Sequence, residues 1–164
     1  MSNEESVAIT LTVNGEAVVR MVPVRQHLVD FLRTELGLTG AHLGCEHGVC
    51  GACSVRVDGA VVRGCLMLAV QADGAEVVTI EGLDDSGEIA DLQQAFVARN
   101  ALQCGFCTPG MLMTVAELLA DHKPKRREEI RTFLSGNYCR CTGYHAIVDA
   151  VATTLEARLN GGRP

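Results

Sequence analysis

The chain has 164 residues, of which 48% are hydrophobic, and it carries a formal net charge of -6 at pH 7. This length can bury one substantial core or two small ones, so we expect one or two domains. The negative charge gives no electrostatic reason to bind nucleic acid or an anionic membrane surface, and no run approaches the roughly 18 to 20 consecutive apolar residues that cross a bilayer.

The N-terminal stretch MSNEESVAIT is acidic and polar, unlike the basic and then apolar start of an export signal. We therefore expect a cytoplasmic protein. Cytosolic thiols are kept reduced, so the eight cysteines indicate metal ligands or redox groups rather than disulfides.

The N-terminal part of the chain has the pattern of a β-hairpin followed by a helix. Residues 7–21 alternate apolar and polar side chains on either side of Asn14-Gly15, a turn dipeptide that tolerates positive φ. Residues 26–36 then place apolar side chains at helical spacing and end at Gly37. We expect this helix to pack on the sheet.

A second hairpin is predicted around Asp58-Gly59, and residues 76–83 are predicted to form one more short strand. Residues 1–82 are thus predicted to be a small α+β domain with a mixed sheet and one helix across it. Its long irregular feature is the Gly-rich loop 37–53, and such loops in compact domains are usually functional.

The first cysteine group lies in and after this loop. GCEHGVCGACSV followed by a later cysteine has the spacing of plant-type 2Fe-2S ferredoxins, in which three ligands share one loop and the fourth follows a hairpin. A zinc site is the alternative, because zinc also accepts four thiolates. The expected ligands are Cys45, Cys50, Cys53 and Cys65.

Three glycines in the same loop, Gly44, Gly48 and Gly51, fit a bulky anionic cluster. Without a Cβ the backbone can wrap closely around the cluster and direct N–H groups at its sulfurs. We therefore expect these glycines to shape the cluster loop.

After residue 83 the hydrophobic pattern changes from period two to helical, which predicts an all-helical second half. Thr108-Pro109 offers an N-cap followed by proline in the first turn of one of these helices. The predicted helices cover residues 90–102, 110–120, 125–134 and 145–159.

The second cysteine group precedes two of these helices, in QCGFCTPG and GNYCRCTGY. Two helix N-termini would converge on one site, where their dipoles stabilise an anionic cluster. A C-x2-C hook with a C-x-C hook is unusual for a single zinc, so the spacing favours iron and sulfur. The expected ligands are Cys104, Cys107, Cys139 and Cys141.

Longer strings around both groups resemble the small iron-sulfur subunit of the molybdenum hydroxylases, the xanthine oxidase and aerobic carbon monoxide dehydrogenase family. They run through nearly the whole chain: VNG, LVDFLRTELGLTG, GCEHGVCGACSV, GCLMLA, LQCGFCTPGM and GNYCRCTGYHAIVDAV. Two separate cysteine motifs in the right order, each inside a longer matching string, argue against accidental similarity.

The resemblance implies a plant-ferredoxin-like (β-grasp) domain, residues 1–82, followed by an all-α four-helix domain, residues 83–164, each holding one 2Fe-2S cluster. It implies electron transfer from molybdopterin through the helical-domain cluster, then the ferredoxin-like cluster, to FAD. Gln103 matches a family glutamine that contacts the pterin, and Arg140 is placed to offset thiolate charge.

The same resemblance implies a molybdopterin-binding large subunit and an FAD-binding medium subunit as partners, in a dimer of heterotrimers. The chain itself shows no catalytic constellation, so it would be the non-catalytic subunit of an oxidoreductase. The substrate of the complex, whether carbon monoxide, an aldehyde, a purine or other N-heterocycle, or an aryl-CoA, is not visible in this subunit. A free-standing soluble ferredoxin and a zinc-stapled interaction module are the competing hypotheses.

Overall fold

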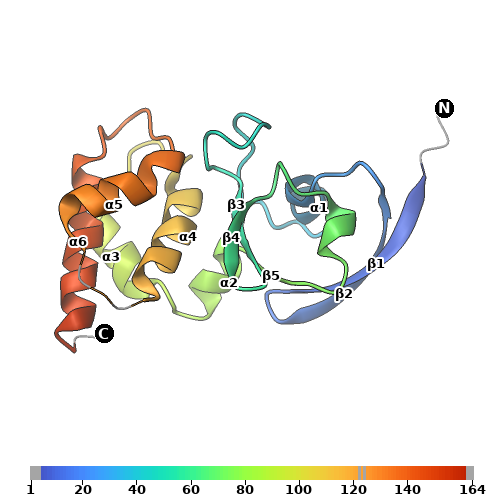
Figure 1. Cartoon of the computed structure of the whole chain (residues 1–164), viewed down its shortest axis with the longest axis horizontal. Coiled ribbons are helices and arrows are strands. Elements are labelled where there is room, and N and C mark those ends of the chain that lie inside the picture. The colour runs from blue at the N-terminus through green and yellow to red at the C-terminus, as the bar shows by residue number, and fades with distance from the viewer. Residues whose placement is uncertain (1–4, 122, 124, 162–164) are drawn as a thin grey trace.

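The computed structural model describes residues 5–121, 123 and 125–161. Figure 1 shows an elongated molecule with the strands and α1 (Leu28–Thr34) at one end and the longer helices at the other. The expected ends of the two domains, residues 1–4 and 162–164, lie outside the described residues.

One mixed sheet organises the N-terminal half. Within the described part of the chain it has five strands in the order β2-β1-β5-β3-β4, with β1 and β5 parallel and the other neighbours antiparallel. Helix α1 contributes a buried face to the core beneath the sheet, as expected. The strands are β1 (Ser6–Val13), β2 (Glu16–Pro23), β3 (Ser54–Val57), β4 (Ala60–Arg63) and β5 (Glu76–Val78).

Both predicted hairpins are confirmed. Asn14 and Gly15 join β1 to β2 with φ of 51° and 84°, and Asp58 and Gly59 join β3 to β4 with φ of 47° and 84°. Both residues of each turn therefore lie in the left-handed region that short hairpin turns require.

The prediction of a single strand over residues 76–83 is wrong in its second part, because β5 ends at Val78 and α2 (Ile80–Asp85) begins two residues later. A long-range contact lies at the change of direction. The amide group of Asn14 accepts the Thr79 N–H at 2.8 Å and donates to the Thr79 hydroxyl at 3.0 Å. This pair holds the chain in place at the point where the strand ends.

The C-terminal half is helical, as expected. The last helix matches its predicted range at both ends, whereas the helix predicted over residues 90–102 ends at residue 98, so its last part is wrong. The residue before α4 is Cys107, so Thr108 is the first helical residue and not the N-cap, and Pro109 lies in the first turn. The helices are α3 (Ala90–Ala98), α4 (Thr108–Leu119), α5 (Arg127–Phe133) and α6 (His145–Leu159).

Helix α4 lies between the other long helices and the sheet (Figure 1). Nine of its residues are buried, on all sides of the helix, which is the pattern of a helix surrounded by protein. It packs against β3 and β4, and its Glu117 carboxylate accepts the N–H of Val61 on the edge strand β4 at 2.9 Å. The helical half is therefore attached to the sheet through α4.

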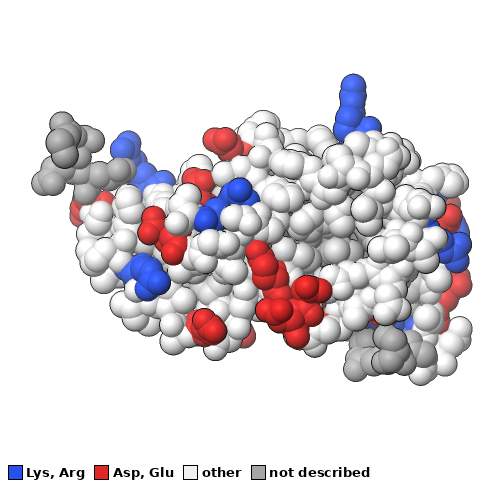
Figure 2. Space-filling view, turned by 180° about the vertical axis from the view of Figure 1, so that it is seen from behind, with Lys and Arg blue, Asp and Glu red and all other residues white. Residues whose placement is uncertain are grey.

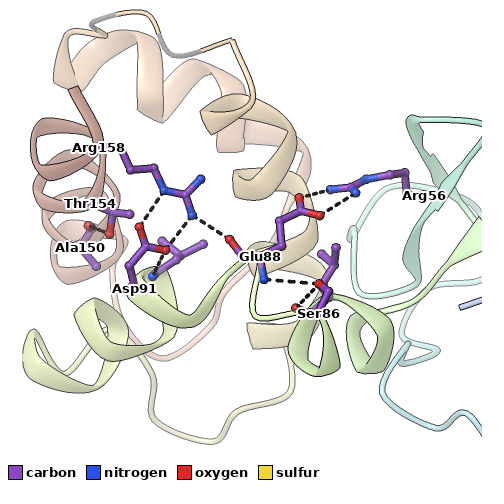
Figure 3. A network of polar contacts seen from close by, with 9 residues as sticks. Arg56, Ser86, Glu88, Asp91, Ala150, Thr154 and Arg158 are labelled. Atoms are coloured by element: carbon purple, nitrogen blue, oxygen red, sulfur yellow. Dashed lines mark hydrogen bonds and ion pairs between the residues drawn. The ribbon is translucent and has the colours of Figure 1, made fainter. Parts of the chain in front are cut away.

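A polar network, shown in Figure 3, links α3, α6 and the sheet. The Arg158 guanidinium donates to both carboxylate oxygens of Asp91 at 2.7 Å and to the Glu88 carbonyl at 2.9 Å. Arg56 of β3 donates to both carboxylate oxygens of Glu88, at 3.0 and 2.6 Å, and holds the pKa of that carboxyl below its usual range. Bidentate pairs of this kind fix geometry as well as charge.

We expect Asp91→Asn to lower the free energy of unfolding by about 1–3 kcal/mol, because it breaks the ion pair with Arg158. The side chains of Asp91 and Arg158 are mostly buried, so this value lies between those of exposed and of fully buried ion pairs. Burial raises the pKa of the Asp91 carboxyl, but Arg158 outweighs burial, so the pKa is lowered overall. A lowered pKa contributes stability that is complete above the unfolded value of about 4 and is lost as the pH falls through the folded value.

The difference between wild type and Asp91→Asn should therefore stay constant from about pH 8 to pH 5, which denaturant unfolding followed by circular dichroism measures. Glu128→Gln is the matched control, because Glu128 makes only an exposed pair with Arg131. A difference that changes across this pH range would contradict the assigned pKa direction.

No helix within the described ranges is long and apolar enough to span a membrane. On the face drawn in Figure 2, acidic side chains gather near the centre and basic side chains are scattered. This face therefore carries part of the net negative charge in concentrated form.

Candidate functional site: two cysteine sites

All eight cysteines lie in described segments, and each is a free thiol. They form two groups, one in the loop before β3 and just after β4, and one in the turns before α4 and α6. We call them the first cysteine site (Cys45, Cys50, Cys53 and Cys65) and the second cysteine site (Cys104, Cys107, Cys139 and Cys141).

The first site is buried on one side and open on the other. Cys53 and Cys65, on either side of the β3–β4 hairpin, are 1% and 2% exposed, whereas Cys45 and Cys50 on the preceding loop are partly exposed. A group bound by all four thiols would therefore contact the protein core on one side and face outward on the other.

Backbone amides of this loop point at sulfur. The Cys50 N–H donates to Cys45 Sγ at 3.4 Å. Backbone hydrogen bonds from His47 and Cys50 lower the pKa of Cys45 to about 6, which favours its thiolate. Burial instead raises the pKa of Cys53 to about 12, a cost that a bound cation would offset.

The three loop glycines are constrained by different neighbours. A Cβ on Gly44 would lie 3.1 Å from Cys50 Sγ, so a side chain there would press on the site itself. Gly48 has φ +83°, and its Cβ would meet Leu66. Gly51 has φ +77°, and its Cβ would lie 2.5 Å from the Gly136 carbonyl oxygen of the helical half.

The second site forms where the turns before α4 and α6 meet. Cys104 and Cys107 come from the first turn and Cys139 and Cys141 from the second, and the sulfurs of Cys104 and Cys141 are 3.6 Å apart. Cys104 is exposed and the other three are partly exposed. This site therefore opens to the surface.

One threonine hydroxyl contacts a sulfur of the second site, and a second threonine follows Cys107 in the chain. Thr142 Oγ1 lies 3.1 Å from Cys139 Sγ. Burial raises the pKa of Cys139, but hydrogen bonds from Thr142, Cys141 and Cys107 together outweigh burial and lower the pKa overall. The Thr108 hydroxyl, next to Cys107, is buried and has no hydrogen-bond partner among the described residues. Burial raises the pKa of Cys107 to about 12.

Both sites fit a 2Fe-2S cluster by their chemistry. Each offers four unpaired thiols, and each places N–H or O–H donors beside sulfur, which is how proteins stabilise such clusters. Within residues 5–121, 123 and 125–161, no three Cys, His, Asp or Glu side chains meet closely enough to hold one metal ion. The fit rests on the donor set and its hydrogen bonds.

Gln103 lies beside the second site and is exposed. Its side-chain nitrogen donates to the Cys141 carbonyl at 3.1 Å, so it connects the two turns that supply the site. Arg140, between Cys139 and Cys141, is exposed.

Sequence reasoning missed the residues that join the two sites. The Tyr138 N–H donates to the Cys50 carbonyl at 2.8 Å, and the neighbouring Asn137 is 2% exposed. His42 bonds through Nδ1 to the Phe106 carbonyl at 2.8 Å and stacks on its ring, with centroids 4.8 Å apart. The only signal in the sequence was the position of Asn137 just before a cysteine motif.

Two protein-family models match the chain: the 2Fe-2S iron-sulfur cluster binding domain over residues 11–79 and the [2Fe-2S] binding domain over residues 79–152. Caffeine dehydrogenase subunit gamma of Pseudomonas sp. (strain CBB1) is 55% identical over 148 residues, covering 87% of each chain. The nicotine 6-hydroxylase small subunit of Paenarthrobacter nicotinovorans is 51% identical, covering 92% of this chain and 90% of the relative.

The crystal structure of quinoline 2-oxidoreductase from Pseudomonas putida 86 contains a chain of the same fold. It superimposes with a TM-score of 0.88 at 47% identity, and the match covers 95% of this chain and 98% of that one. The likeness therefore extends through both cysteine sites.

Proposed function

The chain belongs to the small iron-sulfur subunits of the molybdenum hydroxylase family, which carry two 2Fe-2S clusters, and from this premise we propose that its two cysteine sites are the cluster sites. The first cysteine site would hold the cluster of the ferredoxin-like half, and the second that of the helical half. The observation that carries the assignment is the presence of four free thiols with sulfur-directed donors at each site.

The function of the chain is electron transfer within an oxidoreductase complex, in which it is a non-catalytic subunit. The clusters, when bound, supply reversible one-electron chemistry. The protein buries two thiols of the first site and leaves the second site open to the surface. It also directs an N–H group at a sulfur of the first site and an O–H group at a sulfur of the second.

We propose that the second site faces a molybdopterin-binding large subunit and that the first site passes electrons to an FAD-binding medium subunit. The exposure of Cys104 and Gln103 supports this direction, because a partner surface can approach them. Gln103 would contact the pterin through its amide while its nitrogen remains bonded to Cys141. Gly44, Gly48 and Gly51 would shape the loop of the first site.

The finer organisation is also a proposal. Two domains, residues 1–82 and 83–164, with α3 to α6 as a four-helix domain, are supported by the two family models and by separate hydrophobic cores in the two halves. A cytoplasmic location is supported by the eight free thiols, which a reducing compartment preserves. We further propose a dimer of heterotrimers as the assembly.

We infer that the complex oxidises a nitrogen heterocycle. Caffeine, nicotine and quinoline, named in the relatives and the solved structure, all have nitrogen in a ring. Anaerobic addition of a purine, a pyridine or an aromatic aldehyde to the purified complex tests this, because only a substrate bleaches the iron-sulfur absorbance. Bleaching by the aldehyde alone would overturn the inference.

Low-temperature EPR of the dithionite-reduced native complex tests the proposed function. We expect two distinguishable signals from reduced 2Fe-2S centres. One signal would refute a cluster at one of the sites, and a colourless chain with bound zinc would favour the interaction module instead. A lone, soluble, metal-loaded chain in size-exclusion chromatography would favour the free-standing ferredoxin.

We expect Thr142→Val to make the reduction potential of the second-site cluster about 20–60 mV more negative, the equivalent of one hydrogen bond of about 0.5–1.5 kcal/mol. The Thr142 hydroxyl beside Cys139 Sγ stabilises negative charge on sulfur, and valine keeps the shape without the hydroxyl. EPR-monitored redox titration measures the shift. Thr142→Ser, which keeps the hydroxyl, should restore the potential, and an unchanged potential in Thr142→Val would contradict the role.

A further inference from the structure

One hydrogen bond joins the backbones of the two cysteine sites. The Tyr138 N–H donates to the carbonyl oxygen of Cys50 at 2.8 Å. Cys50 belongs to the first site, and Tyr138 is joined by a peptide bond to Cys139 of the second. The path from sulfur to sulfur is therefore covalent except at this one hydrogen bond.

The residues that flank this bridge are held together by Asn137. Its side-chain nitrogen donates to the carbonyls of Gly51, at 3.4 Å, and Gly110, at 3.0 Å. Its oxygen accepts from the Thr114 hydroxyl at 3.1 Å and from Arg63 at 3.4 Å. Asn137 thus uses both its donors and its acceptor oxygen in a buried position, where such a network is rigid.

We call Asn137 with its hydrogen-bond partners the clamp, and the hydrogen bond from Tyr138 to Cys50 the bridge. The clamp contacts the residues directly next to the bridge. Gly51 directly follows Cys50, and Asn137 directly precedes Tyr138, so the clamp fixes the peptide on each side of the hydrogen bond. Arg63 strengthens it by donating to the Gly136 carbonyl at 2.8 Å. A second contact runs from the His42 side chain to the carbonyl of Phe106, the residue bonded to Cys107, but His42 lies three residues from Cys45, so this path is longer on the side of the first site.

We propose that Asn137 is a positioning residue that holds the Cys50 carbonyl against the Tyr138 N–H, and that this hydrogen bond is the route of electrons between the two clusters. The inference rests on the proposed function. With clusters bound at both sites, one electron would pass, so that the cluster of the second site would lose one electron and the cluster of the first would gain it. No bond forms or breaks, and the electron comes from substrate oxidation in the complex.

A pair of variants at Tyr138 tests the route. Tyr138→Pro removes the bridging N–H, and Asn137 already has φ -123° and ψ 110°, a conformation suited to the residue before proline. Tyr138→Ala removes the ring and keeps the N–H. Since the Tyr138 side chain is 55% exposed, its loss alone should affect packing little.

In a solution of the purified native complex, a light flash generates a one-electron reductant. Rapid freezing and EPR of both cluster signals then follow the exchange of electrons between the clusters. We expect Tyr138→Pro to slow the exchange relative to Tyr138→Ala, because only the proline variant lacks the N–H that connects the two backbones. Tyr138→Ala should exchange like wild type. Equal rates in the two variants would overturn the route.

Hydrogen exchange of the Tyr138 amide tests the clamp without electron transfer. In the wild-type complex this amide should be protected, and Asn137→Ala should speed its exchange by about tenfold or more, the equivalent of one lost hydrogen bond. Thr154→Val is the control, because it removes another buried hydroxyl of the helical half, one that bonds to Ala150. An unprotected Tyr138 amide in wild type would overturn the bridge even if a variant fails to fold.

The two possible failures are distinguishable. Absence of both EPR signals in wild type refutes the proposed function. Two normal signals together with an unprotected Tyr138 amide, or with equal rates in the Tyr138 variants, refute only the role of Asn137 and the bridge.

Discussion

Cys139→Ser is expected to remove the EPR signal of the second-site cluster and to reduce substrate-driven flavin reduction in the complex to background. Cys139 makes two hydrogen bonds. Its N–H donates to the Tyr144 hydroxyl at 2.8 Å, and its sulfur accepts from the Thr142 hydroxyl. Serine keeps the backbone contact, so the loss would come from the missing thiolate. EPR of the dithionite-reduced complex and anaerobic flavin absorbance after substrate addition measure the two effects.

Cys53→Ser is the reciprocal variant for the same experiment. It should remove the signal of the first site and leave that of the second, because Cys53 belongs to the other loop and to the other hydrophobic core. In this variant the substrate should still reduce the second-site cluster while the flavin stays oxidised. Normal flavin reduction in Cys139→Ser would contradict the assigned electron path.

Much of the fold was predictable because its signals are local. The turn dipeptides Asn14-Gly15 and Asp58-Gly59 set both hairpins, since their φ requirement is met by the residues themselves. The end of β5 and the start of α2 were not predictable, because they depend on hydrogen bonds between Asn14 and Thr79. No short window of sequence contains such a contact.

The same distinction holds for the cysteine sites. Spacing alone predicted which thiols group together, because three of the four cysteines of the first site share one loop and the second site has two close pairs. It did not predict that the sites are linked, because the link combines the loop around Gly51, the start of α4 and the residues before Cys139. No periodicity or motif in the sequence around Asn137 predicts that its side chain is buried between the two sites.

Gly51 has a structural role that differs from the predicted one. The sequence suggests that a Cβ here would hold the loop away from a cluster. In the structure the added Cβ would meet the Gly136 carbonyl oxygen at 2.5 Å and Asn137 Nδ2 at 2.7 Å. This glycine therefore also permits the contact between the two halves.

We expect Gly51→Ala to lower the free energy of unfolding by about 2–5 kcal/mol, which combines about 1–2 kcal/mol for a left-handed φ with about 1–3 kcal/mol for overpacking. For a chain of this size that corresponds to a fall in Tm of roughly 5–15 °C. The Gly136 oxygen belongs to the backbone and cannot rotate away, so the loop of the first site must separate from the helical half. Thermal unfolding followed by circular dichroism measures the fall.

Gly74→Ala separates the two contributions to this effect. Gly74 has φ +79°, almost the same as the +77° of Gly51, but an added Cβ would meet nothing within 4 Å. It should therefore cost only the left-handed strain, about 1–2 kcal/mol, and leave the protection of the Tyr138 amide unchanged. The excess loss in Gly51→Ala measures the steric closeness of the two halves. If both variants lost the same stability, the halves would not be in the contact that places Asn137 between the cysteine sites.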